Sequence, residues 1–232
     1  MAAAPTVSGP RGIYIVNLET GKERLLATFG MHPVWSPDGE CIAFTRGSHI
    51  TRTKKDEILV IRASGGEPRQ LAFGYWPVWG KDSNRLFFRS VDSMLCCINV
   101  DDPAARPKTL LRCPGYFAVS PDEKYVAIGC EYSKEIRIAE LSSGLVVARW
   151  IPPLPQYSWP VKWSPNGKEL SLGYWTYYGM IGLWIYDIER KDAWHVLGSP
   201  PDARMTNISS FFVLEIERMV TRRFRDGYPR FG

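Results

Sequence analysis

The sequence lacks the short motifs that mark common enzyme sites. It contains no Gly-x-Ser-x-Gly nucleophile elbow, no glycine-rich phosphate loop and no His-Glu-x-x-His zinc motif. Only three histidines occur, His32, His49 and His195, and they lie far apart in the sequence. A metal site needs a spaced cluster of ligands. We therefore predict no catalytic residues, no metal site and no cofactor, and we expect that the chain is not an enzyme.

Cysteine is scarce and shows no ligand spacing. The five cysteines are an odd number, with no Cys-x-x-Cys pair. They are Cys41, Cys96, Cys97, Cys113 and Cys130. Most fall in apolar segments, where cysteine behaves as a small hydrophobic residue. We expect structural thiols rather than a disulfide framework, which favours a reducing compartment.

Long apolar runs and a broad basic surface are also missing. No stretch of 18 apolar residues occurs, so no membrane span is predicted. The first residues lack a signal peptide pattern, so the chain as written is expected in the cytoplasm, or in the periplasm if a leader is missing. The net charge is +5, but five arginines and one aspartate from Arg218 onward supply most of it. The near-neutral body predicts no nucleic-acid partner.

Aromatic and turn-forming residues, in contrast, are plentiful. The chain has 9 Trp, 10 Phe and 11 Tyr, together with 20 Gly and 18 Pro. Aromatic residues favour strands, and glycine and proline favour tight turns. This composition predicts an all-β fold of short strands.

A repeat of forty-odd residues is the main signal in the sequence. Its four copies are residues 33–44, 77–88, 117–128 and 161–172, and the first reads Pro-Val-Trp-Ser-Pro-Asp-Gly-Glu-Cys-Ile-Ala-Phe. The turn residues Asp38, Asp82, Asp122 and Asn166 mark the same point of each copy. Ser-Pro-Asp-Gly favours a hairpin turn, because proline presets its φ and glycine accepts a left-handed conformation. Forty-odd residues is the length of a four-stranded propeller blade.

The repeat divides the chain into blades. We expect a β-propeller of four-stranded antiparallel blades over 13–222, with units at about 33–73, 77–112, 116–150 and 160–198. A fifth, composite blade would join 13–29 to 206–222, with 217–222 pairing to 12–18 so that the sheet edge is closed. Residues 1–12 would be an N-terminal extension and 223–232 a basic tail. Five blades, or a fragment of a larger propeller, both fit this pattern.

The Trp-Ser-Pro-Asp-Gly pattern with a following Ile-Ala-Phe strand, and Gly-Gly-Glu-Pro-Arg-Gln-Leu at 65–71, resembles the TolB-type, WD-repeat-like propeller repeat. The resemblance covers about residues 13–200 and implies a propeller fold with a binding role. Such repeats occur in the periplasmic Tol–Pal translocation protein, in propeller domains of prolyl-oligopeptidase-like and tricorn-like proteases, and in interaction modules. This chain lacks the six full repeats and the preceding α/β domain of the translocation protein.

Two sets of repeat residues have different expected roles. Trp35, Trp79 and Trp163 lie in the first strand of their repeats and are expected to pack between blades. The residues just before this strand are expected to meet at one mouth of the central channel, where they bind a ligand or plug the channel. These residues are His32, Tyr75, Trp76, Tyr116 and Trp159.

Two functions from different classes follow from these features. The first is a non-catalytic propeller scaffold that binds a protein or peptide partner through the aromatic mouth. The alternative is an accessory propeller domain that gates substrate for a multidomain hydrolase whose catalytic part is absent here. A propeller lyase or sugar-binding enzyme is disfavoured by the lack of a histidine and acid cluster.

Overall fold

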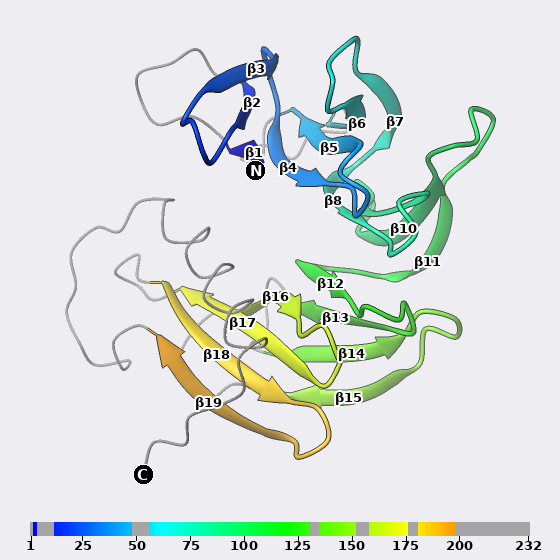
Figure 1. Ribbon diagram of the computed structural model, residues 1–232. Helices are drawn as coiled ribbons and strands as arrows, with labels where there is room; N and C mark the ends of the chain where they lie inside the picture. Colours follow the sequence, from blue (N-terminus) through cyan, green and yellow to red (C-terminus); the bar gives the residue numbers. More distant parts are fainter. Residues whose placement is uncertain are drawn as a thin grey trace. The chain divides into compact units, whose positions relative to one another are not determined.

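The computed structural model describes residues 2–3, 12–47, 56–129, 135–151, 158–175 and 181–197, and every regular element in these residues is a β-strand. None of these residues forms a helix that is long and apolar enough to cross a membrane. The chain divides into two compact units, Met1–Cys113 and Pro114–Gly232. Figure 1 shows that the strands of each sheet lie side by side.

The first unit contains three sheets. A three-stranded sheet has the order β1-β2-β3, and two four-stranded sheets have the orders β4-β5-β6-β7 and β11-β10-β9-β8. The three-stranded sheet consists of β1 (Ala2–Ala3), β2 (Ile13–Val16) and β3 (Glu23–Ala27). The next consists of β4 (Met31–Trp35), β5 (Cys41–Arg46), β6 (Glu57–Arg62) and β7 (Arg69–Phe73). The third consists of β8 (Tyr75–Trp79), β9 (Arg85–Arg89), β10 (Met94–Asn99) and β11 (Lys108–Arg112).

The second unit contains two sheets of four strands. Their orders are β12-β13-β14-β15 and β16-β17-β18-β19. The first consists of β12 (Phe117–Val119), β13 (Tyr125–Gly129), β14 (Ile136–Glu140) and β15 (Val146–Trp150). The second consists of β16 (Ser158–Trp163), β17 (Glu169–Trp175), β18 (Ile181–Asp187) and β19 (Asp192–Leu197). All pairs within these sheets are antiparallel and consecutive in the chain, as in propeller blades.

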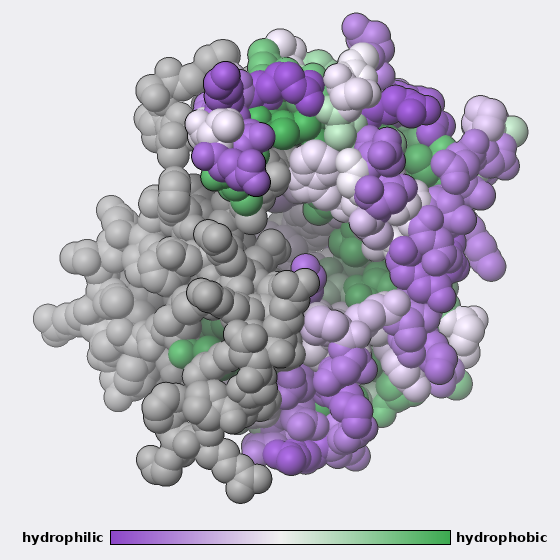
Figure 2. Space-filling model, viewed as in Figure 1, coloured by the Kyte–Doolittle hydropathy of each residue, from purple (hydrophilic) through white to green (hydrophobic). Residues whose placement is uncertain are grey.

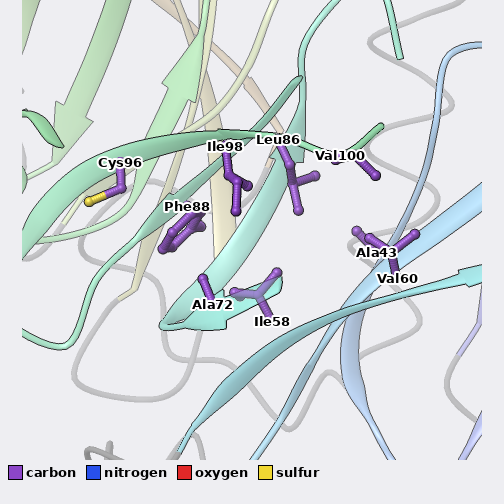
Figure 3. Close-up of a cluster of buried hydrophobic side chains, with 9 residues drawn as sticks. All are labelled: Ala43, Ile58, Val60, Ala72, Leu86, Phe88, Cys96, Ile98 and Val100. Carbon is purple, nitrogen blue, oxygen red and sulfur yellow. The ribbon is translucent and has the colours of Figure 1, made fainter. Parts of the chain in front are cut away.

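Alternation along the inner strands explains why they are apolar on both faces. Ile42 and Phe44 of β5 pack with Ile13 and Ala27 of the first sheet. Ala43, which lies between them, packs in the opposite direction in the cluster shown in Figure 3. That cluster joins the second and third sheets of the unit and consists of Ala43, Ile58, Val60, Ala72, Leu86, Phe88, Cys96, Ile98 and Val100. Because successive side chains point to opposite faces, a strand between two blades needs a continuous apolar run.

The same packing recurs in the second unit. Ala118, Ala127, Ile136 and Ile138 pack with residues of the following sheet, among them Trp163.

The outer strands differ from the inner strands, because their outer side faces water. β7 and β11 are mostly exposed, and Figure 2 shows hydrophilic residues over them. The sheets that contain β7 and β11 therefore change from apolar inner strands to a polar outer strand.

The predicted all-β propeller fold is confirmed. The composite blade is described only in part, since 206–222 and the tail 223–232 lie outside the described residues. Ala2 pairs with Ile15 and Ala3 with Tyr14, so β1 occupies the edge of β2 at which 217–222 was expected to pair. Two residues of the expected N-terminal extension are thus a strand of the first sheet.

Candidate functional site

Each copy of the repeat contains a turn, and side-chain hydrogen bonds stabilise it in three of the four copies. The Ser36 hydroxyl donates to Asp38 Oδ1 at 2.5 Å and accepts from the Cys41 amide at 2.9 Å. Asp38 Oδ1 also accepts from the Glu40 amide at 2.9 Å. The equivalent serine and Asp or Asn pairs are Ser120 with Asp122 at 2.7 Å and Ser164 with Asn166 at 2.6 Å. The side chains of Asp38, Asp122 and Asn166 therefore accept hydrogen bonds within their own turns.

The third sheet departs from this turn. Gly80 stands where the other turns have serine, so Asp82 has no hydroxyl partner at that position. Asp82 instead lies 4.0 Å from the Arg85 guanidinium. Ser83 Oγ accepts from the Asp38 amide at 3.0 Å, which ties this turn to the turn of the preceding blade.

Two of the repeat tryptophans join neighbouring inner strands. Trp79 Nε1 donates to the Val34 carbonyl at 3.1 Å, and Trp163 Nε1 donates to the Ala118 carbonyl at 2.9 Å. In both cases the donor lies 45 residues after its acceptor, in the next blade. These contacts give Trp79 and Trp163 a structural role between blades. Trp35 packs at the edge of the cluster between the first two sheets, but its Nε1 has no hydrogen-bond partner among the described residues.

The residues expected at the channel mouth lie at the beginning of the inner strands. His32 belongs to β4, Tyr75 and Trp76 to β8, and Trp159 to β16, whereas Tyr116 directly precedes β12. The inner strands therefore begin earlier than the sequence pattern predicted. Three of these residues are in the first unit and two are in the second.

His32 and Trp76 share an unusual backbone conformation. Their φ angles are 53° and 55°, in the left-handed region that residues with a side chain rarely adopt. Both lie at an irregularity of the register, between Met31 and Val34 in β4 and between Tyr75 and Val78 in β8. A bulge of this kind turns a side chain away from its regular direction. Non-glycine residues in this region cost about 1–3 kcal/mol and cluster at functional sites.

The buried side chain of Arg89 packs against the ring of Trp76. Its guanidinium carbon lies 5.4 Å from the centroid of the Trp76 ring, within reach of a cation–π interaction. Arg89 Nε donates to the Cys113 carbonyl at 2.9 Å, and its Nη2 donates to Ser93 Oγ at 2.7 Å. Only 6% of Arg89 is exposed. The Tyr75 ring is buried and lies 6.1 Å from that of Trp76, so Trp76 has both Arg89 and Tyr75 as neighbours while remaining partly exposed itself.

Gly74 allows this close packing. A Cβ at this position would lie 2.4 Å from the Arg89 carbonyl oxygen and 2.8 Å from the Phe88 ring. The Gly74 amide donates to the carbonyl of Asp56 at 2.9 Å, and Asp56 is 1% exposed. Gly74 thus lies next to the backbone of two buried charged residues, Asp56 and Arg89.

The second unit carries its own aromatic pair. The rings of Tyr116 and Trp159 lie 6.1 Å apart with an interplanar angle of 45°. Trp159 pairs in register with Gly173, and a Cβ on Gly173 would lie 2.7 Å from the indole ring. The Trp159 ring therefore packs directly against the backbone of β17 at Gly173, which has no side chain. Tyr116 is 39% exposed, so the pair presents aromatic surface.

Sequence analysis found the aromatic residues but missed Arg89. In the register of β8 and β9, Arg89 lies opposite Tyr75, as Gly173 lies opposite Trp159. The signal was an arginine directly after the apolar run Leu86-Phe87-Phe88, where the other repeats have Thr45, Gly129 and Gly173. A charge at the end of a buried strand indicates a specific role.

Other reactive groups have structural surroundings. Within the described residues, Cys41, Cys96, Cys97 and Cys113 form no disulfide, and burial raises the pKa of Cys41 and Cys96. A raised pKa keeps a thiol protonated, whereas nucleophilic cysteines have a lowered one. Within the described ranges, no three His, Cys, Asp or Glu side chains gather as metal ligands would.

Comparisons with known proteins agree on the fold. Family models give no match to the sequence, and a search of curated proteins gives none. Among solved structures, TolB from Acinetobacter baumannii matches with a TM-score of 0.67 and 19% identity, over 85% of this chain and 51% of that chain. A TolB-like protein from Agrobacterium tumefaciens matches with a TM-score of 0.62 and 15% identity, over 80% of this chain and 73% of that chain.

A third similar structure is an enzyme. A puromycin-hydrolysing peptidase from Mycobacterium tuberculosis matches with a TM-score of 0.59 and 16% identity, over 85% of this chain and 34% of that chain. These likenesses show the β-propeller fold of the TolB proteins, as the repeat predicted. The chain spans 51% of the Acinetobacter protein and about a third of the peptidase.

Proposed function

We propose that this chain is a non-catalytic β-propeller that binds a protein or peptide through the aromatic residues at the start of its inner strands. The observation that carries the proposal is the arrangement of Trp76. Its backbone is held in the left-handed region, and its ring packs against a buried guanidinium. Packing between strands requires neither feature, since Trp79 makes its inter-blade contact from an ordinary backbone conformation. Strain of this kind is kept where a side chain must be presented in a defined direction.

The arrangement suits binding because it is rigid before a partner arrives. Arg89 is fixed by two hydrogen bonds, and its contact with Trp76 limits the rotation of the indole ring. A side chain that is already ordered loses little entropy on association. Large aromatic rings also supply apolar area together with a polar N–H or O–H, which is why they dominate many interface energies.

The second unit supports the same proposal with the contact between Tyr116 and Trp159. Tyr116 exposes part of its ring, and its carbonyl accepts from the Gly129 amide at 2.9 Å, which fixes its backbone. His32 is exposed and occupies the place in its repeat that Trp76 occupies in the next. We propose that these residues extend the contact surface of their own unit.

The alternative is an accessory propeller domain that gates the substrate of a multidomain hydrolase. The likeness to the Mycobacterium peptidase favours it, because this chain spans only 34% of that protein. The two functions differ in what accompanies the propeller. The coding sequence next to this chain would contain a hydrolase domain with a nucleophile elbow in the second case and none in the first.

Selection from a random peptide library displayed on phage tests the proposal. The library is panned on the wild-type chain and, in parallel, on the Trp76→Ala variant. We expect peptides that are enriched on the wild type and lost on the variant, because Trp76 provides the anchoring surface. Enrichment of the same peptides on both proteins would contradict a role for Trp76 in binding.

A further inference from the structure

The outer strand β15 of the second unit carries much exposed apolar surface. It stands at the end of the order β12-β13-β14-β15, and in the described part of the chain it pairs with β14 alone (Figure 1). Large hydrophobic side chains along the strand and directly beside it are between 40% and 67% exposed, namely Leu145, Val146, Val147 and Ile151. The other edge of β15 therefore offers backbone groups for pairing next to apolar side chains.

The other outer strands of the four-stranded sheets have charges at their ends. β7 begins with Arg69 and β19 with Asp192. β11 has Lys108 and Arg112 at its two ends. Charged residues on an edge strand oppose pairing with another chain. β15 has the sequence Val-Val-Ala-Arg-Trp, in which Arg149 is the single charge, so its ends lack this protection.

The charge beside this edge is positive. The Glu135 carboxylate accepts from Arg137 Nε at 2.5 Å and from Arg149 Nη1 at 3.2 Å. One carboxylate thus lies between two guanidinium groups, which leaves one positive charge uncompensated. The Arg149 side chain is exposed. A guanidinium has several N–H donors, so Arg149 can bind a second carboxylate from a partner.

Arg149 lies among the exposed apolar side chains. Along residues 147–151, exposed side chains alternate with half-buried ones. The half-buried Ala148 and Trp150 pack with the cluster that joins this sheet to the following one. Because successive side chains of a strand point to opposite faces, Arg149 points away from that cluster. Val147 and Ile151 are the exposed residues on either side of it in this alternation.

We propose that the open edge of β15 binds an extended peptide segment of a partner protein that carries apolar residues and an acidic residue between them. The segment pairs with β15 as a further strand, which supplies backbone hydrogen bonds, and its carboxylate binds Arg149. A second copy of this chain is a poorer occupant, because it would bring a second uncompensated positive charge to the edge. The inference uses none of the residues of the proposed function and is independent of it.

Titration of the full chain with two synthetic peptides tests the proposal. The probe is an acetylated and amidated peptide, Thr-Val-Glu-Val-Thr-Ile-Thr, and its matched control has lysine in place of glutamate. We expect the glutamate peptide to bind saturably and to protect the backbone amides of residues 145–151 from hydrogen exchange. The lysine peptide should bind at least fivefold more weakly. Absence of this protection, or equal binding of the two peptides, would overturn the proposal.

A lysine on the edge should block the peptide. Val147→Lys changes an exposed residue of β15, and Gln70→Lys makes the same kind of change at an exposed residue of the outer strand β7. We expect Val147→Lys to weaken binding of the glutamate peptide at least tenfold and Gln70→Lys to leave it unchanged. Equal effects of the two substitutions would contradict binding at β15.

A charge reversal keeps the test decisive if Val147→Lys does not fold. Arg149→Glu leaves two carboxylates beside one guanidinium, so the variant should prefer the lysine peptide. Trp76→Ala should bind the glutamate peptide as the wild type does. An unchanged peptide preference in Arg149→Glu would overturn the proposal. Protection of 145–151 that rises with protein concentration in the absence of peptide would also overturn it, because a second copy would then occupy the edge.

Discussion

At the scale of single residues, the same chemistry has two uses in this chain. Indole N–H groups of Trp79 and Trp163 connect blades through backbone carbonyls. Trp76, three residues before Trp79, is turned out of the regular strand direction and packs on Arg89. The difference lies in the backbone, because residues at a bulge no longer alternate between the faces of the blade. Residue type alone does not distinguish structural from functional tryptophans here.

The turn residue Asp38 makes the stability of the fold depend on pH in the acid range. The hydroxyl of Ser36 and then the amide of Glu40 donate to the Asp38 carboxylate and hold its pKa below its ordinary value. The folded state therefore prefers the ionised form. Its stabilising effect is complete above the ordinary pKa and is lost as the pH falls through the lowered pKa of the folded state.

We predict that Asp38→Asn reduces the acid sensitivity of the protein. Asparagine keeps the accepting oxygen, as Asn166 does in the last repeat, where Oδ1 accepts from Ser164 and from the Lys168 amide. The variant should be no more stable than the wild type at neutral pH and should lose less stability between pH 5 and roughly pH 2. Urea denaturation across this range measures both effects. Parallel stability curves for the two proteins would show that the Asp38 pKa is the same in the folded and unfolded states.

At the scale of elements, the hairpin between the inner and second strands is the unit that repeats. Its fourth residue is left-handed in every complete repeat: Gly39, Ser83, Glu123 and Gly167 have φ angles of 77°, 57°, 57° and 71°. Glycine adopts this conformation without strain, and other residues do so at some cost. The turn thus tolerates replacement of glycine where hydrogen bonds hold the loop.

We predict that Gly39→Ala destabilises the fold by about 1 kcal/mol, because alanine is strained at a positive φ while its unfolded state is less flexible. No atom lies within 4 Å of the added methyl group, so the effect would be conformational. Gly167→Ala is the matched variant, since its nearest atom is 3.9 Å away. Equal losses in the free energy of unfolding are expected from denaturant titration. A loss at one site only would mean that the turns are not equivalent.

The elements also show which parts of the structure the sequence predicts. The turn residues and apolar runs repeat, so the hairpins and inner strands can be predicted from the sequence alone. Arg89 was missed because its contact with Trp76 depends on the register of β8 and β9 around a bulge. β1 was missed because it consists of Ala2 and Ala3, and alanine is neither β-branched nor aromatic, the two residue classes that favour strands. Both depend on contacts between segments rather than on local pattern.

At the scale of the whole molecule, the repeats predict the fold better than the function. The comparisons show the propeller fold at 19% identity or less, where the fold is shared by TolB proteins and a peptidase. Function is carried by sites on a fold and not by the fold itself. The candidate site residues were found because large amphipathic rings recur at one point of the repeat. Their separate arrangement in each unit could not be read from that spacing.

We predict that the purified chain does not hydrolyse peptide or glycoside substrates. Burial raises the pKa of Cys41 and Cys96, which opposes thiolate formation. Assays with chromogenic peptides and glycosides should give the rate of the buffer alone. Turnover that persists through purification and is abolished by one point substitution would contradict this prediction.

The most direct measurement compares the Trp76→Ala and Trp79→Ala variants, each in a titration with a library-selected peptide and in a thermal melt. If Trp76 is a binding anchor, Trp76→Ala should weaken binding by about 2 kcal/mol or more, which corresponds to roughly 30-fold in Kd. It should lower the melting temperature less than Trp79→Ala, which removes packing and the hydrogen bond to Val34. Unchanged affinity in Trp76→Ala, or a loss of stability as large as that of Trp79→Ala, would show that Trp76 is structural.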